Sequence, residues 1–97
     1  MKTMIMGRAE SEERTRMAKM LFGAAGKNPY YRGELVIKNF KELRDHIGKF
    51  TEGETGWVAA WIEYLGDRGT AARIKQTPKR FKDIINARYE ELKRYAT

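Results

Sequence analysis

Five cationic side chains follow one another within the ten-residue segment RIKQTPKRFK, which contains no carboxylate. They are Arg73, Lys75, Lys79, Arg80 and Lys82. Clustered guanidinium and ammonium groups neutralise phosphates, and the free amides at the start of a helix add further donors for an anion. We therefore expect a phosphate-binding surface here, with nucleic acid as the first anionic partner to test.

The same segment also fits a solvated surface that serves solubility alone. Asp83, Glu90 and Glu91 follow it and offset part of its charge. The four-residue spacing of Lys79 with Asp83, and of Glu90 with Arg94, predicts two helical ion pairs of about 0.3 kcal/mol each. The sequence leaves both interpretations open.

Residues suited to catalysis or metal binding do not form a recognisable pattern. The chain has no cysteine, and its single histidine, His46, has Asp45 and Glu42 nearby but no nucleophile. The carboxylates around the central helix lack the spacing of a calcium loop: Glu52, Glu54, Glu63 and Asp67. We therefore expect a non-enzymatic protein with no metal and no cofactor, and a surface or partly packed His46.

Trp57 and Trp61 stand one helical turn apart and could form a stacking platform for bases or sugars. They share their segment with Val58, Ile62 and Leu65, which recur at helical spacing. This pattern favours burial, and we expect both indoles in the core.

Four further apolar side chains, Met17, Met20, Leu21 and Phe22, fall on one predicted helix. A methionine-rich face is flexible and fits irregular grooves, in the same chain or in a partner. Packing within the chain is the expected fate of this face. If it is exposed, the alternative function is a protein–protein interaction or homodimerisation domain with no nucleic-acid role.

Capping signals and apolar periods predict four main helices and a short connecting one. The first helix is expected over about 12–24 with Ser11 as N-cap, and the second over 40–49 with Asn39 and Glu42 as a capping box. The third is expected over 57–65, with start signals at Thr51, Glu54 and Thr55. The short connecting helix is expected over 71–75 with Thr70 as N-cap, and the last helix runs for about five turns from Pro78 with Thr77 as cap. Residues 34–37 form a β-prone run without an obvious partner, residues 23–33 a loop, and residues 1–8 have no assignment. The predicted fold class is mainly α, a small bundle of about four main helices with at most one short β strand or strand pair.

The segment from Val58 to Lys75, helix, glycine turn and helix, invites comparison with a DNA-binding helix-turn-helix. In that motif Ile62 would replace a small residue, Asp67 an apolar one, and Lys75 a core residue. We therefore expect two core helices joined by a turn in which Gly66 adopts the left-handed C-cap conformation.

Residues in the carboxy-terminal two thirds also resemble those of a small, functionally uncharacterised domain family of archaea and bacteria. The similarity lies in ELVIKNFKELRDHIGKF and in Trp61, Ile62, Gly66, Asp67, Ala71, Ala72 and Ile74, and covers about half of the chain. The family's His-Val and Asn-Asp-Phe residues before the tryptophan have no counterpart, and Thr70-Ala71 replaces its Leu-Ala pair. The resemblance implies an α-rich fold and no specific activity.

Length and composition favour one small folded domain of 97 residues, with an amino-terminal segment (1–33) of one helix and a loop and a compact helical unit (34–97). The net charge of +7 divides into +4, −2 and +5 over residues 1–33, 34–66 and 67–97, so both ends are basic. No apolar run suits a membrane span or a signal peptide, and we expect a cytoplasmic protein. Abundant charged residues with few Asn, Gln and Cys resemble thermophile composition.

Overall fold

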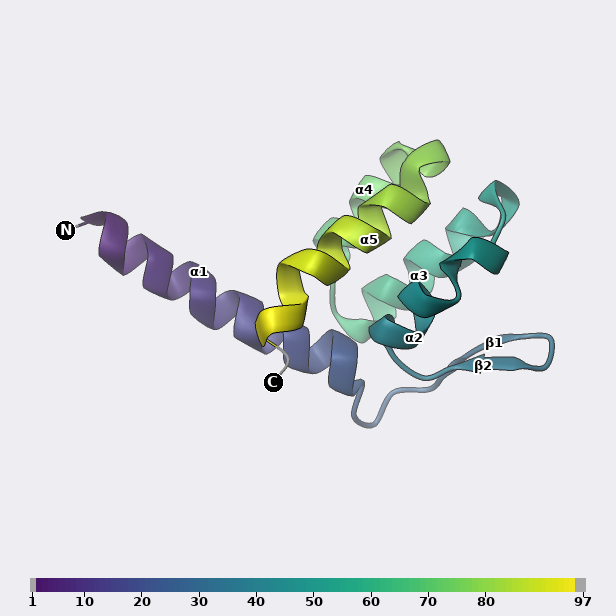
Figure 1. Cartoon of the computed structure of the whole chain (residues 1–97), viewed down its shortest axis with the longest axis horizontal. Coiled ribbons are helices and arrows are strands. Elements are labelled where there is room, and N and C mark those ends of the chain that lie inside the picture. Colours follow the sequence, from purple (N-terminus) through teal and green to yellow (C-terminus); the bar gives the residue numbers. More distant parts are fainter. Residues whose placement is uncertain (1, 96–97) are drawn as a thin grey trace.

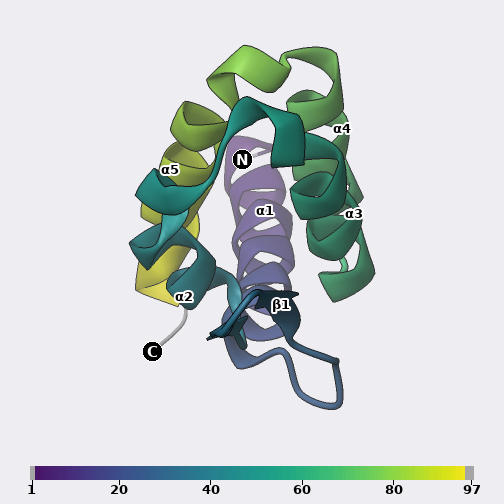
Figure 2. The ribbon, with the colours of Figure 1, turned by 90° about the vertical axis from the view of Figure 1, so that its right-hand side faces the viewer.

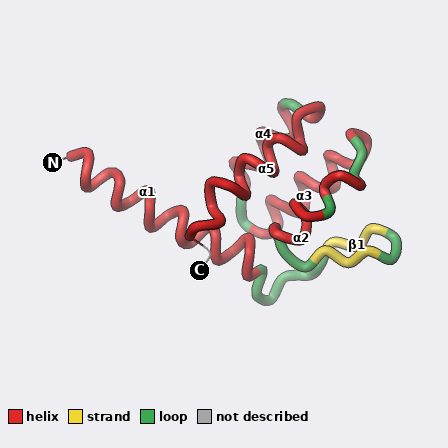
Figure 3. The backbone as a smooth tube through the Cα atoms, viewed as in Figure 1, coloured by secondary structure: helices red, strands yellow, loops and turns green. Residues whose placement is uncertain are grey.

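The computed structural model of the chain describes residues 2–95, with side chains from residue 10 onward. Within this range the chain forms five α-helices and one β-hairpin, which Figure 1 labels and Figure 3 distinguishes by colour. The helices are α1 (Lys2–Ala18), α2 (Phe40–Asp45), α3 (Thr55–Leu65), α4 (Arg68–Gln76) and α5 (Phe81–Leu92), and the strands are β1 (Tyr30–Arg32) and β2 (Leu35–Ile37). A π-helical turn (Lys19–Gly23) extends α1, and 3₁₀ turns lie at Ile47–Lys49, Glu52–Glu54, Pro78–Arg80 and Lys93–Tyr95. The predicted mainly α fold class is confirmed.

The core lies between two pairs of helices. Figure 2 shows α2 and α5 on one side and α3 and α4 on the other, with α1 behind them. Fully buried side chains from α2 to α5 and from the π turn build this core: Leu21, Phe40, Leu43, Ile62, Ile74 and Ile85. Each contributes about 1.5–3 kcal/mol by leaving water, which makes this cluster the main source of stability.

Helix α1 is longer than expected and runs through the residue predicted to cap it. The Thr15 hydroxyl donates to the Ser11 carbonyl (2.9 Å) inside the helix, so the prediction of Ser11 as N-cap is wrong. Figure 1 shows the first turns of α1 extending away from the other elements. Most of the methionine-rich face packs within the chain, because Leu21 is fully buried and Phe22 lies edge-on to Phe40 and Tyr89, whereas Met20 is 39% exposed.

The β-prone run finds its partner in a segment that we expected to be a loop. Strand β1 pairs antiparallel with β2, with Tyr31 opposite Val36. Gly33 in the connecting turn has φ +61°, a left-handed conformation that glycine adopts without strain. A two-residue turn joins antiparallel strands directly, so the partner of β2 is the segment that immediately precedes it in the sequence.

Two capping motifs fix the starts of α2 and α3. The Asn39 side chain accepts from the Glu42 amide (2.9 Å), as predicted, and Thr51 and Glu54 form a capping box ahead of α3. Helix α2 ends at Asp45, sooner than the predicted residue 49, and the 3₁₀ turn Ile47–Lys49 continues it. These caps satisfy backbone amides that would otherwise lack partners.

The turn between α3 and α4 has the glycine C-cap that the sequence predicts, with φ +125° at Gly66. The cap of α4 is Asp67, whose carboxylate accepts from the Thr70 amide (3.1 Å). The prediction of Thr70 as N-cap is therefore wrong, and α4 begins at Arg68 and runs to Gln76, longer than the predicted 71–75. The two helices pack closely together as core elements.

The last helix follows a 3₁₀ turn. Pro78 occupies its first position, as expected, but the Thr77 side chain makes no capping hydrogen bond. Among the described helices none is both long enough and apolar enough to cross a membrane.

Candidate nucleic-acid interface

The five predicted cations lie on three consecutive elements that we call the basic turn: Arg73, Lys75, Lys79, Arg80 and Lys82. Arg73 and Lys75 belong to the last turn of α4, Lys79 and Arg80 to the 3₁₀ turn, and Lys82 to the first turn of α5. All are exposed except Lys82, which is half-buried. The chain reversal between α4 and α5 brings these positions to one end of the bundle (Figure 1).

Only two of the five, Arg73 and Arg80, line the same depression, a groove of about 480 Å³ between α4 and α5. We call it the α4–α5 groove, and its walls are Arg73, Gln76, Thr77, Arg80, Asp83, Ile84 and Ala87. Lys75, Lys79 and Lys82 do not line it. The structure thus assembles a pair of guanidinium groups that the sequence does not distinguish from the other cations.

Ion pairs divide the basic turn into free and engaged cations. Lys75 is held toward α3, with its Nζ 3.3 Å from Glu63 Oε1. Arg80 Nε lies 3.7 Å from Asp83 Oδ2 in a pair that is exposed on both sides, and such a pair contributes little. Arg73 and Lys79 form no ion pair within residues 10–95, so their charges face solvent.

The two predicted four-residue ion pairs are both wrong. Asp83 pairs with Arg80 in place of Lys79, and Glu90 pairs with Lys93 (2.8 Å) in place of Arg94. In each case the partner lies three residues away, because both spacings put side chains on the same face of a helix. The cation Lys79 is consequently left unpaired.

Backbone amides contribute less to this surface than expected. Pro78, the first residue of the 3₁₀ turn, has no N–H, and the Arg80 amide donates to the Thr77 carbonyl (3.0 Å). The Phe81 amide donates to the Pro78 carbonyl. The capacity of the basic turn to bind an anion therefore rests mainly on its side chains.

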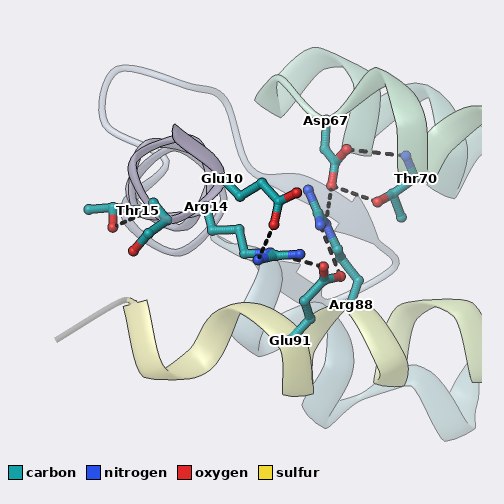
Figure 4. A network of polar contacts seen from close by, with 8 residues as sticks. Glu10, Arg14, Thr15, Asp67, Thr70, Arg88 and Glu91 are labelled. Carbon is teal, nitrogen blue, oxygen red and sulfur yellow. Dashed lines mark hydrogen bonds and ion pairs between the residues drawn. The ribbon is translucent and has the colours of Figure 1, made fainter. Parts of the chain in front are cut away.

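A polar network at the start of α4 and the end of α5, away from the basic turn, joins the helices (Figure 4), and no local sequence pattern singles it out. Asp67 is 2% exposed, and its Oδ2 accepts from Arg88 Nε (2.8 Å) and from the Thr70 hydroxyl (2.6 Å). Arg88 Nη1 donates to Glu91 (3.0 Å), which also accepts from Arg14 on α1 (3.3 Å). The network joins α1, α4 and α5.

Charge and burial oppose each other in this network. Burial by itself would lower the pKa of Arg88, but hydrogen bonds and charges from Asp67 and Glu91 outweigh burial and raise it. Burial would likewise raise the pKa of Glu91, whereas Arg88 and Arg14 lower it. The ion pairs therefore favour the charged forms of Arg88 and Glu91.

The two tryptophans have opposite environments, so the prediction that both are buried is wrong for Trp57. Trp61 is 7% exposed, and its indole Nε1 donates to the Asn28 carbonyl (3.0 Å). Trp57 is 73% exposed. At 100° per residue Trp57 lies about 140° around α3 from Ile62, the centre of the buried face, whereas Trp61 lies about 100° away. The pair cannot act together as a stacking platform.

The single histidine lies outside the basic turn. His46 is half-buried at the end of α2, where its amide donates to the Glu42 and Leu43 carbonyls. Across residues 10–95 no group of three His, Asp or Glu side chains is placed to hold a metal ion. The basic turn is the surface on which a function can be built.

Comparison with known proteins does not identify the chain. No family model matches it, and neither a curated protein nor a solved structure is similar to it. The functional inference rests on the charges and contacts described above.

Proposed function

We propose that the protein is a non-enzymatic module that binds nucleic acid through the basic turn. The observation that carries this proposal is the convergence of Arg73 and Arg80, from two elements, on one groove. Arginine binds phosphate oxygens through two parallel N–H donors, which fixes orientation as well as charge. Two such groups on one groove suit a phosphodiester better than scattered lysines do.

The charge distribution supports the same partner. The net charge is +7, and residues 67–97 hold the largest excess of cations. An excess of this sign raises the rate of encounter with a polyanion. Unpaired Lys79 next to the groove adds a phosphate contact without a competing carboxylate.

Fluorescence anisotropy with labelled duplex and single-stranded DNA and RNA tests the proposal. If Arg73, Lys79 and Arg80 each contact a phosphate, the slope of log affinity against log salt is roughly −3 for duplex. Reversing the charges with Lys79→Glu, Arg80→Glu and Lys82→Glu should abolish binding. Absence of binding by the unmodified protein at low ionic strength would remove the proposal.

A matched control separates a local site from total charge. The triple variant Arg16→Glu, Lys19→Glu and Lys38→Glu replaces one arginine and two lysines, all exposed and outside the basic turn. It has the same net charge as the charge-reversed basic turn. Equal loss of affinity in both variants would mean that the basic turn has no special role.

A second function, association with a protein partner or with another copy, has one observation in its favour. The first turns of α1 extend away from the bundle (Figure 1). Light scattering across a concentration series tests it, and the charge-reversed basic turn should leave such association intact. The apolar side chains Met17, Leu21 and Phe22 are already packed against the core and would not be free to take part.

A further inference from the structure

The α4–α5 groove contains more than cations. Arg73, Gln76 and Thr77 line it from the end of α4, whereas Ile84 and Ala87 line it from α5. Ile84 and Ala87 are three residues apart and therefore neighbours on one helix face. The groove thus has a cationic side and a small apolar side formed by exposed Ala87 and the edge of buried Ile84.

The groove also contains a carboxylate that a simple anion site would exclude. Asp83 lines it, and Arg80 approaches one Asp83 oxygen at 3.7 Å. This carboxylate repels phosphate but can accept a hydrogen bond from an exocyclic amino group of a base. A ligand that carries both an anion and such an amino group fits the lining better than phosphate alone.

We infer that the α4–α5 groove takes one unpaired nucleotide of a single strand, with its phosphate at Arg73 and Arg80 and its base against Ile84 and Ala87. This inference rests on the proposed function and gives it a substrate class. The volume of about 480 Å³ lies within the range of roughly 300–1,000 Å³ found for small-ligand sites. A base inside a duplex is stacked and paired, and would have to leave the helix to enter the groove.

A groove-filling substitution tests the inference without changing charge. Ala87 is exposed, and leucine is nearly as good a helix former, so Ala87→Leu should fold normally. It should weaken binding of a single-stranded cytosine oligonucleotide about tenfold and leave duplex affinity unchanged. Ala60→Leu, at an exposed alanine of α3, is the matched control and should change neither affinity.

Substitution of Asp83 provides a second, independent test of the inference. The unmodified protein should bind cytosine or adenine oligonucleotides more tightly than thymine ones of equal length, since thymine lacks an exocyclic amino group. Asp83→Asn removes a negative charge and should tighten binding to thymine oligonucleotides while reducing the preference for cytosine. Tightening by the same factor for every base would overturn the role of Asp83 and with it the base in the groove.

A measurement on the unmodified protein covers the case in which a variant does not fold. Cytidine monophosphate added to isotope-labelled protein should shift the amide signals of Gln76, Thr77 and Ala87. Equal shifts with inorganic phosphate, or equal effects of Ala87→Leu on single strand and duplex, would overturn the inference while leaving phosphate binding in place. Failure of any nucleic acid to bind at low salt would remove the proposed function and this inference together.

Discussion

Asp67 connects three helices through a single buried carboxylate. It caps α4 through the Thr70 amide and binds Arg88 on α5, which continues through Glu91 to Arg14 on α1. A buried carboxylate is stable only while its partners neutralise it. Loss of Arg88 would leave the Asp67 charge largely uncompensated.

We therefore expect Arg88→Met to lower the free energy of unfolding by about 3 kcal/mol, since methionine keeps the apolar bulk but leaves a buried charge unpaired. Urea denaturation followed by circular dichroism measures this change. Arg16→Met, at an exposed arginine of α1, is the control and should change stability by less than about 0.5 kcal/mol. Equal small effects in both variants would show that Asp67 does not depend on Arg88.

The two indoles should give separate fluorescence signals. Trp61→Phe retains Trp57, which is 73% exposed, and should show red-shifted emission that acrylamide quenches strongly. Trp57→Phe retains Trp61, which is 7% exposed, and should show blue-shifted, protected emission. Protected emission from Trp57 would place that ring in a contact that the single chain does not provide.

At the residue scale the sequence predicts the chemical type of a side chain better than its environment in the fold. Apolar spacing identifies the buried face of α3, but it does not decide the fate of a large side chain at the edge of that face, as Trp57 and Trp61 demonstrate. Asp67 next to Gly66 looks like an ordinary turn residue. Its burial depends on Arg88, which is 21 residues away in sequence, so local pattern could not predict it.

The junction of α3 and α4 depends on the missing side chain of Gly66. Its φ of +125° is unfavourable for any residue with a Cβ, and a Cβ here would collide with the Met20 methyl group. Gly66→Ala should cost about 1–2 kcal/mol from backbone strain alone, with the displacement of Met20 in addition. Gly56→Ala, in a helical position with no atom within 4 Å, should instead stabilise by about 0.5–1 kcal/mol.

Thermal denaturation of both glycine variants checks this prediction. Adding Met20→Ala to Gly66→Ala should recover part of the loss, because the collision is removed while the strained φ persists. Full recovery would assign the whole effect to Met20, and equal behaviour of Gly56→Ala and Gly66→Ala would contradict the left-handed cap.

The hairpin is attached to the start of α3 by an acid-sensitive pair. Arg32 donates to both Glu54 oxygens (2.8 and 3.0 Å), and with the Thr51 hydrogen bonds this lowers the pKa of Glu54 from 4.5 to about 2. A pKa that is lower in the folded state stabilises the fold above the unfolded value. This stabilisation is complete above pH 4.5 and is lost as the pH falls toward 2.

Glu54→Gln should therefore destabilise the protein at pH 7, and the difference from the unmodified chain should shrink as the pH falls from about 4.5 to 2. Unfolding by urea at several pH values measures it. Glu52→Gln, in the same 3₁₀ turn but exposed, is the control and should show a nearly constant difference. A Glu54→Gln difference that does not change with pH would mean that the pair with Arg32 is not formed in solution.

At the element scale, capping residues and apolar periods predict the presence of the helices. They do not predict the exact helix ends or the hairpin. Asn39 with Glu42, and Gly66, mark boundaries because one residue satisfies local backbone groups. Strand β1 has little pattern of its own, since Tyr30 and Tyr31 point to opposite faces and pairing with β2 defines it. Ser11 is a residue type typical of N-caps, yet α1 begins at Lys2, so Ser11 lies inside the helix.

The whole molecule is elongated, with extents of 50 × 28 × 18 Å and a Cα radius of gyration of 13.9 Å. A 97-residue globular domain would have about 12.5 Å, and extended α1 accounts for the difference. Small-angle X-ray scattering of a monomer should therefore give a longest dimension slightly above 50 Å. A mass twice the monomer value with a much larger dimension would instead support association through α1.

The candidate site shows the same division between what sequence predicts and what folding adds. All five cations were recognisable from RIKQTPKRFK, but the sequence could not show that Arg73 and Arg80 share a groove while Lys75 is held by Glu63. The two arginines are seven positions apart in the sequence, and the chain reversal at Pro78 brings them to the same groove. Which of several nearby charges forms an ion pair depends on the tertiary structure.

The contact between Met20 and Gly66 places an oxidisable side chain at the α3–α4 turn. Met20 is 39% exposed, so oxidants can reach its sulfur. Methionine sulfoxide is bulkier and polar, and the Met20 methyl group lies where a Cβ of residue 66 would stand. Aged samples should therefore lose the contact of the π-helical turn with the α3–α4 turn, and a sulfoxide reductase should restore it.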